Sequence, residues 1–149
     1  MPTVASAVRS DEGLASELRL AVMRLRRRLV AERDPANELS LSQMSVLGSL
    51  YRLGELSIGE LAAHERVQPP SMTRTVSCLE ERGHVLRRPH ASDGRQVLVS
   101  LSDLGRRTLL ADRERRDLWL AQRLTELTHE QRAVLRQAVP VLAGLADTE

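Results

Sequence analysis

Residues 57–83 read SIGELAAHERVQPPSMTRTVSCLEERG, and they contain several signals for the start and end of helices. Ser57 and Glu60 form a capping box, in which a hydroxyl and a carboxylate each satisfy a free backbone amide at the start of a helix. A proline pair, favoured in the first turn of a helix, follows after a short break. The closing Gly83 is typical of the position just after a helix ends. The stretch therefore predicts a short helix, a tight turn and a second helix.

The second helix has two different faces. At 100° per residue, Met72, Val76 and Leu79 fall together and are expected to pack against the rest of the domain. The opposite side carries short polar side chains and an arginine, which are suitable partners for phosphates and base edges. Its residues are Pro70, Thr73, Arg74, Ser77 and Glu81. A polar face that is merely solvated is the alternative interpretation.

The periodicity changes after this helix. Apolar residues alternate in residues 96–101, which predicts a strand, and a second short run covers residues 84–88. The polar loop between them contains the turn signal Asp93-Gly94. We expect a β-hairpin here. Together with the helices before it, the hairpin predicts a winged helix-turn-helix.

The hairpin is unusually basic for a simple turn, with Arg87, Arg88, His90 and Arg95 in and beside its loop. A narrow minor groove of DNA concentrates negative potential and attracts an inserted arginine. The alternative for Arg95 is an ordinary surface ion pair with Asp93, which contributes little to stability. Both interpretations can hold together, with Asp93 orienting Arg95 for DNA.

Apolar spacing and capping boxes predict the remaining helices. They are expected over residues 11–33, 40–53, 102–127 and 129–146. Pro140 should kink the last of them. The predicted fold class is mainly α with a small β-hairpin wing, with the N- and C-terminal helices forming a dimerisation region.

Composition sets limits on function. The 149 residues include one Trp, one Tyr and no Phe, so the core must be aliphatic. All basic residues are arginine, but the formal net charge of +2 merely permits nucleic-acid binding. The lone Cys78 excludes an intramolecular disulfide and fits a reducing compartment. Because no signal peptide or membrane span is evident, we expect a cytoplasmic protein.

From about Leu39 to Leu109 the chain resembles the MarR family of bacterial regulators. The resemblance is carried by the ordered set of residues 57–62, 71–74 and 79–83, the wing triplet Asp93-Gly94-Arg95, and residues 99–105. It implies that the helix with Ser71, Thr73 and Arg74 enters the major groove and that Arg95 enters the minor groove. Gly94 departs from the usual Asp-Arg-Arg wing and removes one phosphate contact. Ser102 replaces the usual threonine cap, with little consequence.

We expect the chain to divide into a flexible tail (1–10), a dimerisation helix (11–36), a winged helix-turn-helix (37–101) and C-terminal dimerisation helices (102–149). A small winged helix cannot cover the apolar stripes of the terminal helices, so a second copy is expected to bury them. The resemblance also implies a homodimer. The two-fold symmetry of a dimer then implies a pseudo-palindromic DNA operator. The alternative is that the helices fold back into a larger monomer.

Two sets of candidate site residues follow. The DNA-binding candidates are Gln68, Pro70, Ser71, Thr73, Arg74, Ser77, Arg87, His90, Asp93 and Arg95. The resemblance also implies a small anionic or aromatic effector, for which the weak candidates are Met23, Met44, Leu47 and Tyr51; plain core positions are the alternative. The four histidines show no metal-ligand spacing, so we expect no metal and no cofactor.

These features predict a sequence-specific regulator of transcription that binds double-stranded DNA. Repression is the default, because a dimer across a promoter blocks polymerase, and the resemblance implies relief by the effector. The chain has no glycine-rich phosphate loop and no nucleophile elbow, so an enzyme is not expected. The alternative is a winged-helix protein-interaction module without DNA binding.

Overall fold

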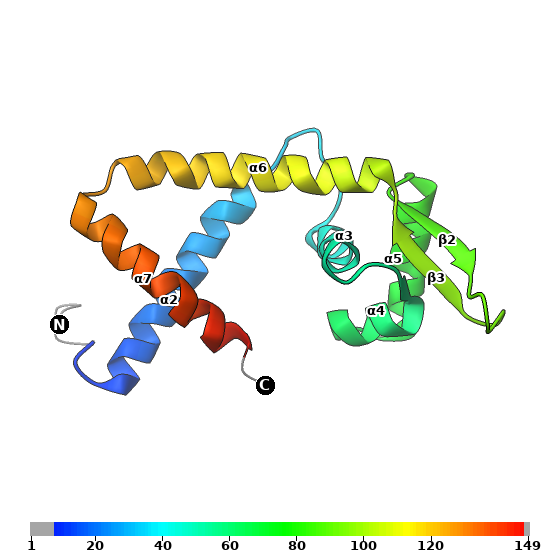
Figure 1. Ribbon diagram of the computed structural model, residues 1–149, viewed down its shortest axis with the longest axis horizontal. Coiled ribbons are helices and arrows are strands. Elements are labelled where there is room, and N and C mark those ends of the chain that lie inside the picture. Colours follow the sequence, from blue (N-terminus) through cyan, green and yellow to red (C-terminus); the bar gives the residue numbers. More distant parts are fainter. Residues whose placement is uncertain (1–7, 148–149) are drawn as a thin grey trace. The chain divides into compact units, whose positions relative to one another are not determined.

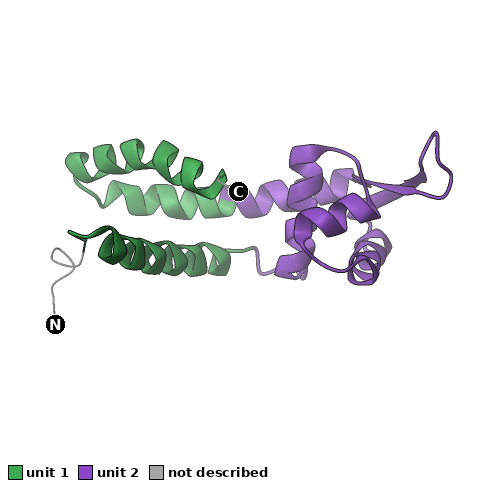
Figure 2. Cartoon of the chain, turned by 90° about the horizontal axis from the view of Figure 1, so that it is seen from below, with its two compact units in different colours: residues 1–33, 115–149 green, residues 34–114 purple. Residues whose placement is uncertain are grey.

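The computed structural model describes residues 8–147, and the chain separates into two compact units (Figure 2). One unit spans residues 34–114. The other combines the two ends of the chain, residues 1–33 and 115–149. Most of the predicted tail, residues 1–10, lies outside the described residues. Ser10 is described, and its hydroxyl caps the first helix by accepting a hydrogen bond from the backbone N–H of Gly13.

Helices dominate both units, with one small sheet in the unit of residues 34–114 (Figure 1). That unit holds α3 (Leu41–Leu53), β1 (Leu56–Ser57), α4 (Ile58–Glu65), α5 (Pro69–Glu81), β2 (Val85–Pro89), β3 (Val97–Leu101) and the first half of α6 (Asp103–Thr125). The terminal unit holds α2 (Asp11–Ala31), the rest of α6 and α7 (His129–Asp147). The predicted capping boxes that start α3, α4 and α7 are all formed. Helix α7 continues through Pro140.

The sheet has three antiparallel strands in the order β1-β3-β2. The β2–β3 hairpin confirms the predicted wing. Strand β1 was not predicted, because two residues are too few to show alternation. It pairs Leu56 with Val99 and Ser57 with Leu98, and so attaches the loop before α4 to the centre of the sheet.

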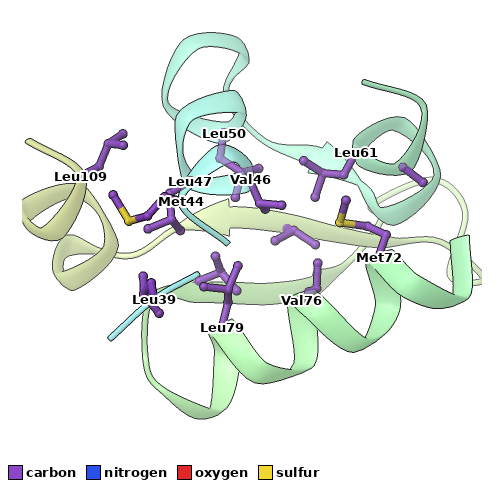
Figure 3. Close-up of a cluster of buried hydrophobic side chains, with 13 residues drawn as sticks. Leu39, Met44, Val46, Leu47, Leu50, Leu61, Met72, Val76, Leu79 and Leu109 are labelled. Atoms are coloured by element: carbon purple, nitrogen blue, oxygen red, sulfur yellow. The ribbon is translucent and has the colours of Figure 1, made fainter. Parts of the chain in front are cut away.

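A single aliphatic core holds this unit together. Met72, Val76 and Leu79 point from α5 towards side chains of α3 and α4 (Figure 3). All three are at most 2% exposed, which confirms the predicted buried face of α5. Leu47 and Leu61 are fully buried in the same cluster. Burying each such side chain contributes about 1.5–3 kcal/mol, so the orientation of α5 is strongly determined.

A buried carboxylate on α6 binds the segment that precedes α3. Asp112 on α6 is 0% exposed and accepts hydrogen bonds from the backbone N–H of Asp34 at 3.2 Å and from Nδ2 of Asn37 at 3.0 Å. A buried charge is tolerated only when it is hydrogen-bonded in this way. The contact fixes the segment that precedes α3 against α6.

The connection from α5 into the sheet is tight. Gly83 adopts a positive φ of 79°, and the next residue, His84, donates its backbone N–H to Leu79 O at 2.8 Å. The carbonyl of His84 then accepts from the backbone N–H of Ser102. At this point Gly105, in the first turn of α6, passes so close that an added Cβ would lie 2.1 Å from the His84 oxygen.

Gly105→Ala is therefore expected to destabilise the fold by about 1–3 kcal/mol, because the backbone of α6 or of His84 must move. Gly48→Ala in α3 is the matched control, since its added Cβ meets only the end of the Arg113 side chain, at 3.9 Å. In a helix interior that change should be neutral or stabilising by up to about 1 kcal/mol. Urea denaturation of the two variants checks both signs, and equal effects would contradict the packing described.

Candidate nucleic-acid interface

The start of α5 presents side chains rather than free backbone amides. Pro69 and Pro70 have no N–H, and the amides of Ser71 and Met72 both donate to the carbonyl of Gln68. The usual attraction of a helix N-terminus for phosphate, which depends on free N–H groups, is therefore weak here. The side chains of α5 must supply any binding of nucleic acid.

Four of the α5 candidates lie at its outer face. Gln68, Pro70, Thr73 and Arg74 are exposed. The Thr73 hydroxyl donates to the carbonyl of Pro69 at 3.0 Å, which leaves its oxygen lone pairs to accept from outside. Arg74 makes no ion pair or side-chain hydrogen bond with any residue that the structure describes. Its guanidinium is thus a free cation at the middle of the polar face.

The wing loop is held by its own polar side chains. Nδ1 of His90 accepts from the backbone amides of Ser92 and Asp93, each at 3.2 Å. The Asp93 carboxylate accepts from the backbone N–H of Arg95 at 3.1 Å, and a turn closes with the amide of Gln96 donating to Asp93 O. Gly94 does not adopt a positive φ. His90 and Asp93 therefore shape the loop.

Arg95 is the exposed cation of this loop. Within the described part of the chain its guanidinium has no carboxylate within ion-pair distance. The expected link between Asp93 and Arg95 exists, but it runs through the backbone amide of Arg95. The guanidinium is left available at the tip of the wing.

The two arginines at the base of the wing are engaged elsewhere in the protein. Arg88 holds Glu55 with two hydrogen bonds, one from Nε to Oε2 at 2.7 Å and one from Nη2 to Oε1. These hydrogen bonds keep the pKa of the Glu55 carboxyl below its usual value of 4.5 and raise the pKa of Arg88. Arg87 contacts Ser77 and Glu80 on α5. Two DNA-binding candidates, Arg87 and Ser77, thus bind each other.

Three of the four effector candidates lie in the unit of residues 34–114, and only one of these three, Tyr51, is exposed. Met44 and Leu47 are core residues, 7% and 0% exposed, and Met23 is exposed on α2 in the other unit. Tyr51 is 38% exposed and stacks with two guanidiniums of α6. Those of Arg106 and Arg113 lie 5.3 and 4.9 Å from the ring centroid.

The pair of arginines on Tyr51 is a feature that sequence reasoning missed. Arg106 and Arg113 are seven residues apart, which places them on one face of a helix, so the spacing was a usable signal. Their partner Tyr51 lies more than fifty residues earlier, and no local pattern connects it to them. Neither guanidinium has an acidic partner among the residues the structure describes.

Other features of the described residues lie away from these candidates. A pocket of about 560 Å³ lies between the segment before α3 and the start of α6, and none of the predicted site residues lines it. Residues 8–147 contain no cluster of His, Cys, Asp and Glu suited to a metal ion. They also contain no helix long and apolar enough to cross a membrane.

Comparisons with known proteins agree with this geometry. The sequence model of the MarR family matches residues 39–97. An uncharacterized HTH-type transcriptional regulator of Mycobacterium bovis, Mb0904, is 49% identical over 138 residues, covering 93% of this chain and 96% of the relative. The chain belongs to the MarR family. The predicted resemblance is confirmed, and the protein is a transcriptional regulator.

Further relatives support the same assignment of this MarR-family chain. A putative transcriptional regulator of Pseudomonas aeruginosa has a crystal structure that matches with a TM-score of 0.83 at 38% identity, over 95% of this chain and 99% of that one. The HTH-type transcriptional repressor MdtR of Bacillus subtilis is 26% identical over 95% of this chain and 94% of its own. The predicted fold class, mainly α with a β-hairpin wing, is confirmed by the structural match.

Proposed function

We propose that this MarR-family regulator binds a specific pseudo-palindromic duplex as a homodimer, with α5 in the major groove and the wing in the adjacent minor groove. One observation carries the proposal: Arg74 and Arg95 are exposed cations without acidic partners among the described residues, one on α5 and one on the wing. Arginine pairs with guanine edges in the major groove and with the negative potential of a narrow minor groove.

The neighbouring polar residues fit the same role. Gln68, Ser71 and Thr73 offer amide and hydroxyl groups beside Arg74, and such groups contact both phosphates and base edges. His90 and Asp93 support Arg95 by fixing the loop that carries it. A protein-interaction module is the alternative function, and it gives no reason for two unpaired arginines on adjacent elements.

The homodimer is supported by the terminal unit. Helices α2 and α7 bury no residue within the single chain. Large apolar side chains on these helices and the second half of α6 are 38–64% exposed. They include Leu14, Val22, Leu118, Leu135, Val139 and Leu142. Apolar surface of this kind on a soluble domain marks an interface, and a second copy carries a matching surface.

We also propose that DNA binding represses transcription and that a small anionic aromatic compound relieves it. The Tyr51 ring with Arg106 and Arg113 is the feature that supports an effector site. Two guanidiniums on one ring repel each other unless an anion lies between them, and a carboxylate accepts a bidentate bond from arginine. The ring of an aromatic carboxylate would contact the exposed edge of Tyr51 at the same time.

Arg74→Ala and Arg95→Ala should both weaken binding to an operator fragment selected from genomic DNA. Arg74→Ala should cost about 1–3 kcal/mol and relax the preference at one base pair, whereas Arg95→Ala should weaken binding and leave the dimer intact. Fluorescence anisotropy with the operator and with single-base variants measures both effects. Arg107→Ala on α6 is the control, and Arg95→Ala with unchanged affinity would make the wing assignment wrong.

Val139→Glu should convert the protein to a monomer at micromolar concentration. Burying an uncompensated carboxylate in the dimer interface costs several kcal/mol, so the dimer dissociation constant should rise by about 100-fold or more. Sedimentation equilibrium measures this, with Gln137→Glu on the same helix as the control for added charge. A variant that stays dimeric would show that the α7 surface is not the interface.

Salicylate, as a phenolic carboxylate probe, should weaken operator binding at constant ionic strength. Arg113→Ala should reduce this sensitivity several-fold, because it removes one of the two cations that would hold the carboxylate. Arg107→Ala removes a charge from the same helix and should leave the sensitivity unchanged. Equal sensitivity of all three proteins would rule out the Tyr51 cluster as the effector site.

A further inference from the structure

Strand alternation places Arg87 on the inner face of the wing. It pairs with Val99, which is 0% exposed, and it lies two residues after Val85, which is 1% exposed. Side chains two residues apart share one face of a strand. The side chain of Arg87 therefore starts above the hydrophobic core, while the next residue, Arg88, points to the other face and binds Glu55.

From this position the guanidinium of Arg87 reaches two successive turns of α5. Its Nη2 donates a hydrogen bond to Oγ of Ser77 at 2.5 Å. Its Nε lies 3.3 Å from Oε2 of Glu80, within ion-pair distance, although the buried Nε–H makes no aligned hydrogen bond. The Arg87 side chain is 25% exposed, against 56% for that of Arg88. The guanidinium of Arg87 thus joins the wing to α5.

We propose that Arg87 is a positioning residue that fixes α5 and the wing as one body. Its ion pair with Glu80 also keeps the Glu80 carboxylate away from the DNA phosphates. The inference rests on the proposed function, because it concerns how Arg74 and Arg95 reach one duplex together. Holding both arginines in place before binding reduces the ordering cost of the complex. Arg87 and Ser77 then contribute to DNA recognition through each other rather than through contacts with DNA.

Lysine cannot replace arginine in this arrangement. The ammonium of lysine is a point charge, whereas the guanidinium presents several donors in a fixed plane. The contacts with Ser77 and Glu80 come from two different nitrogens of that plane, Nη2 and Nε, whereas lysine has a single nitrogen. A residue that only neutralises a phosphate needs the charge, which lysine also has. The affinity of Arg87→Lys therefore distinguishes a positioning role for Arg87 from direct binding to a phosphate.

The experiment measures operator affinity against salt concentration for the full-length variants. Arg87→Ala and Arg87→Lys should each lower affinity about tenfold, with the slope of log K against log salt unchanged. A lost phosphate contact would instead reduce that slope by about 0.9 in Arg87→Ala and leave Arg87→Lys near normal. Either of those results would overturn the proposal.

Ser77→Ala and Glu80→Gln test the two partners with milder changes. Each should weaken binding, and the double variant Arg87→Ala/Ser77→Ala should bind no worse than Arg87→Ala alone. Glu114→Gln, which removes an exposed negative charge from α6, is the control and should not weaken binding. Additive losses, or equal effects of Glu80→Gln and Glu114→Gln, would overturn the coupling.

Hydrogen exchange of the free protein provides a test without DNA. Arg87→Ala should speed exchange in β2, in β3 and in the second half of α5, whereas Glu114→Gln should not. If the parent protein fails to bind DNA while this exchange result holds, the proposed function is wrong, but the link that Arg87 makes between the wing and α5 is supported. If the parent binds DNA, and Arg87→Ala matches it in operator affinity and in hydrogen exchange, only the positioning role of Arg87 is wrong.

Discussion

The packing of three α5 side chains on the aliphatic core fixes which face of this helix is exposed. Met72, Val76 and Leu79 are nearly or fully buried against α3, α4 and the central strand. Their spacing leaves no freedom in which side of α5 meets solvent. Arg74 is exposed for that reason alone, and the turn at Gly83 then carries the chain directly into the wing.

The base of the wing extends this constraint to the hairpin. Arg87 and Arg88 are neighbours on β2, and alternation sends their side chains to opposite faces of the sheet. One joins the wing to α5, and the other joins it to Glu55 before β1. Two arginines in sequence therefore brace the hairpin from both sides. Arg95, farther along the loop, remains outside these contacts.

Local features were predictable from the sequence and distant contacts were not. The starts of the helices were predicted correctly, because capping boxes such as Ser57 with Glu60 act within one turn. The buried face of α5 followed from periodicity. The bond between Arg87 and Ser77 could not be predicted, because it depends on the strand register that brings β2 against α5. The same holds for Tyr51 and its two arginines, and for β1, which is defined only by its partner strand.

If Arg74 on α5 and Arg95 on the wing bind duplex DNA, as we propose, the affinity must depend strongly on salt concentration. The affinity of the intact protein for a genomic fragment would be measured by fluorescence anisotropy between about 50 and 200 mM salt. We expect a linear fall of log K with log salt, with a slope of about 0.9 for each phosphate neutralised. If no binding is detected at low salt, or if the affinity does not change with salt, the proposed binding of Arg74 and Arg95 to DNA is wrong.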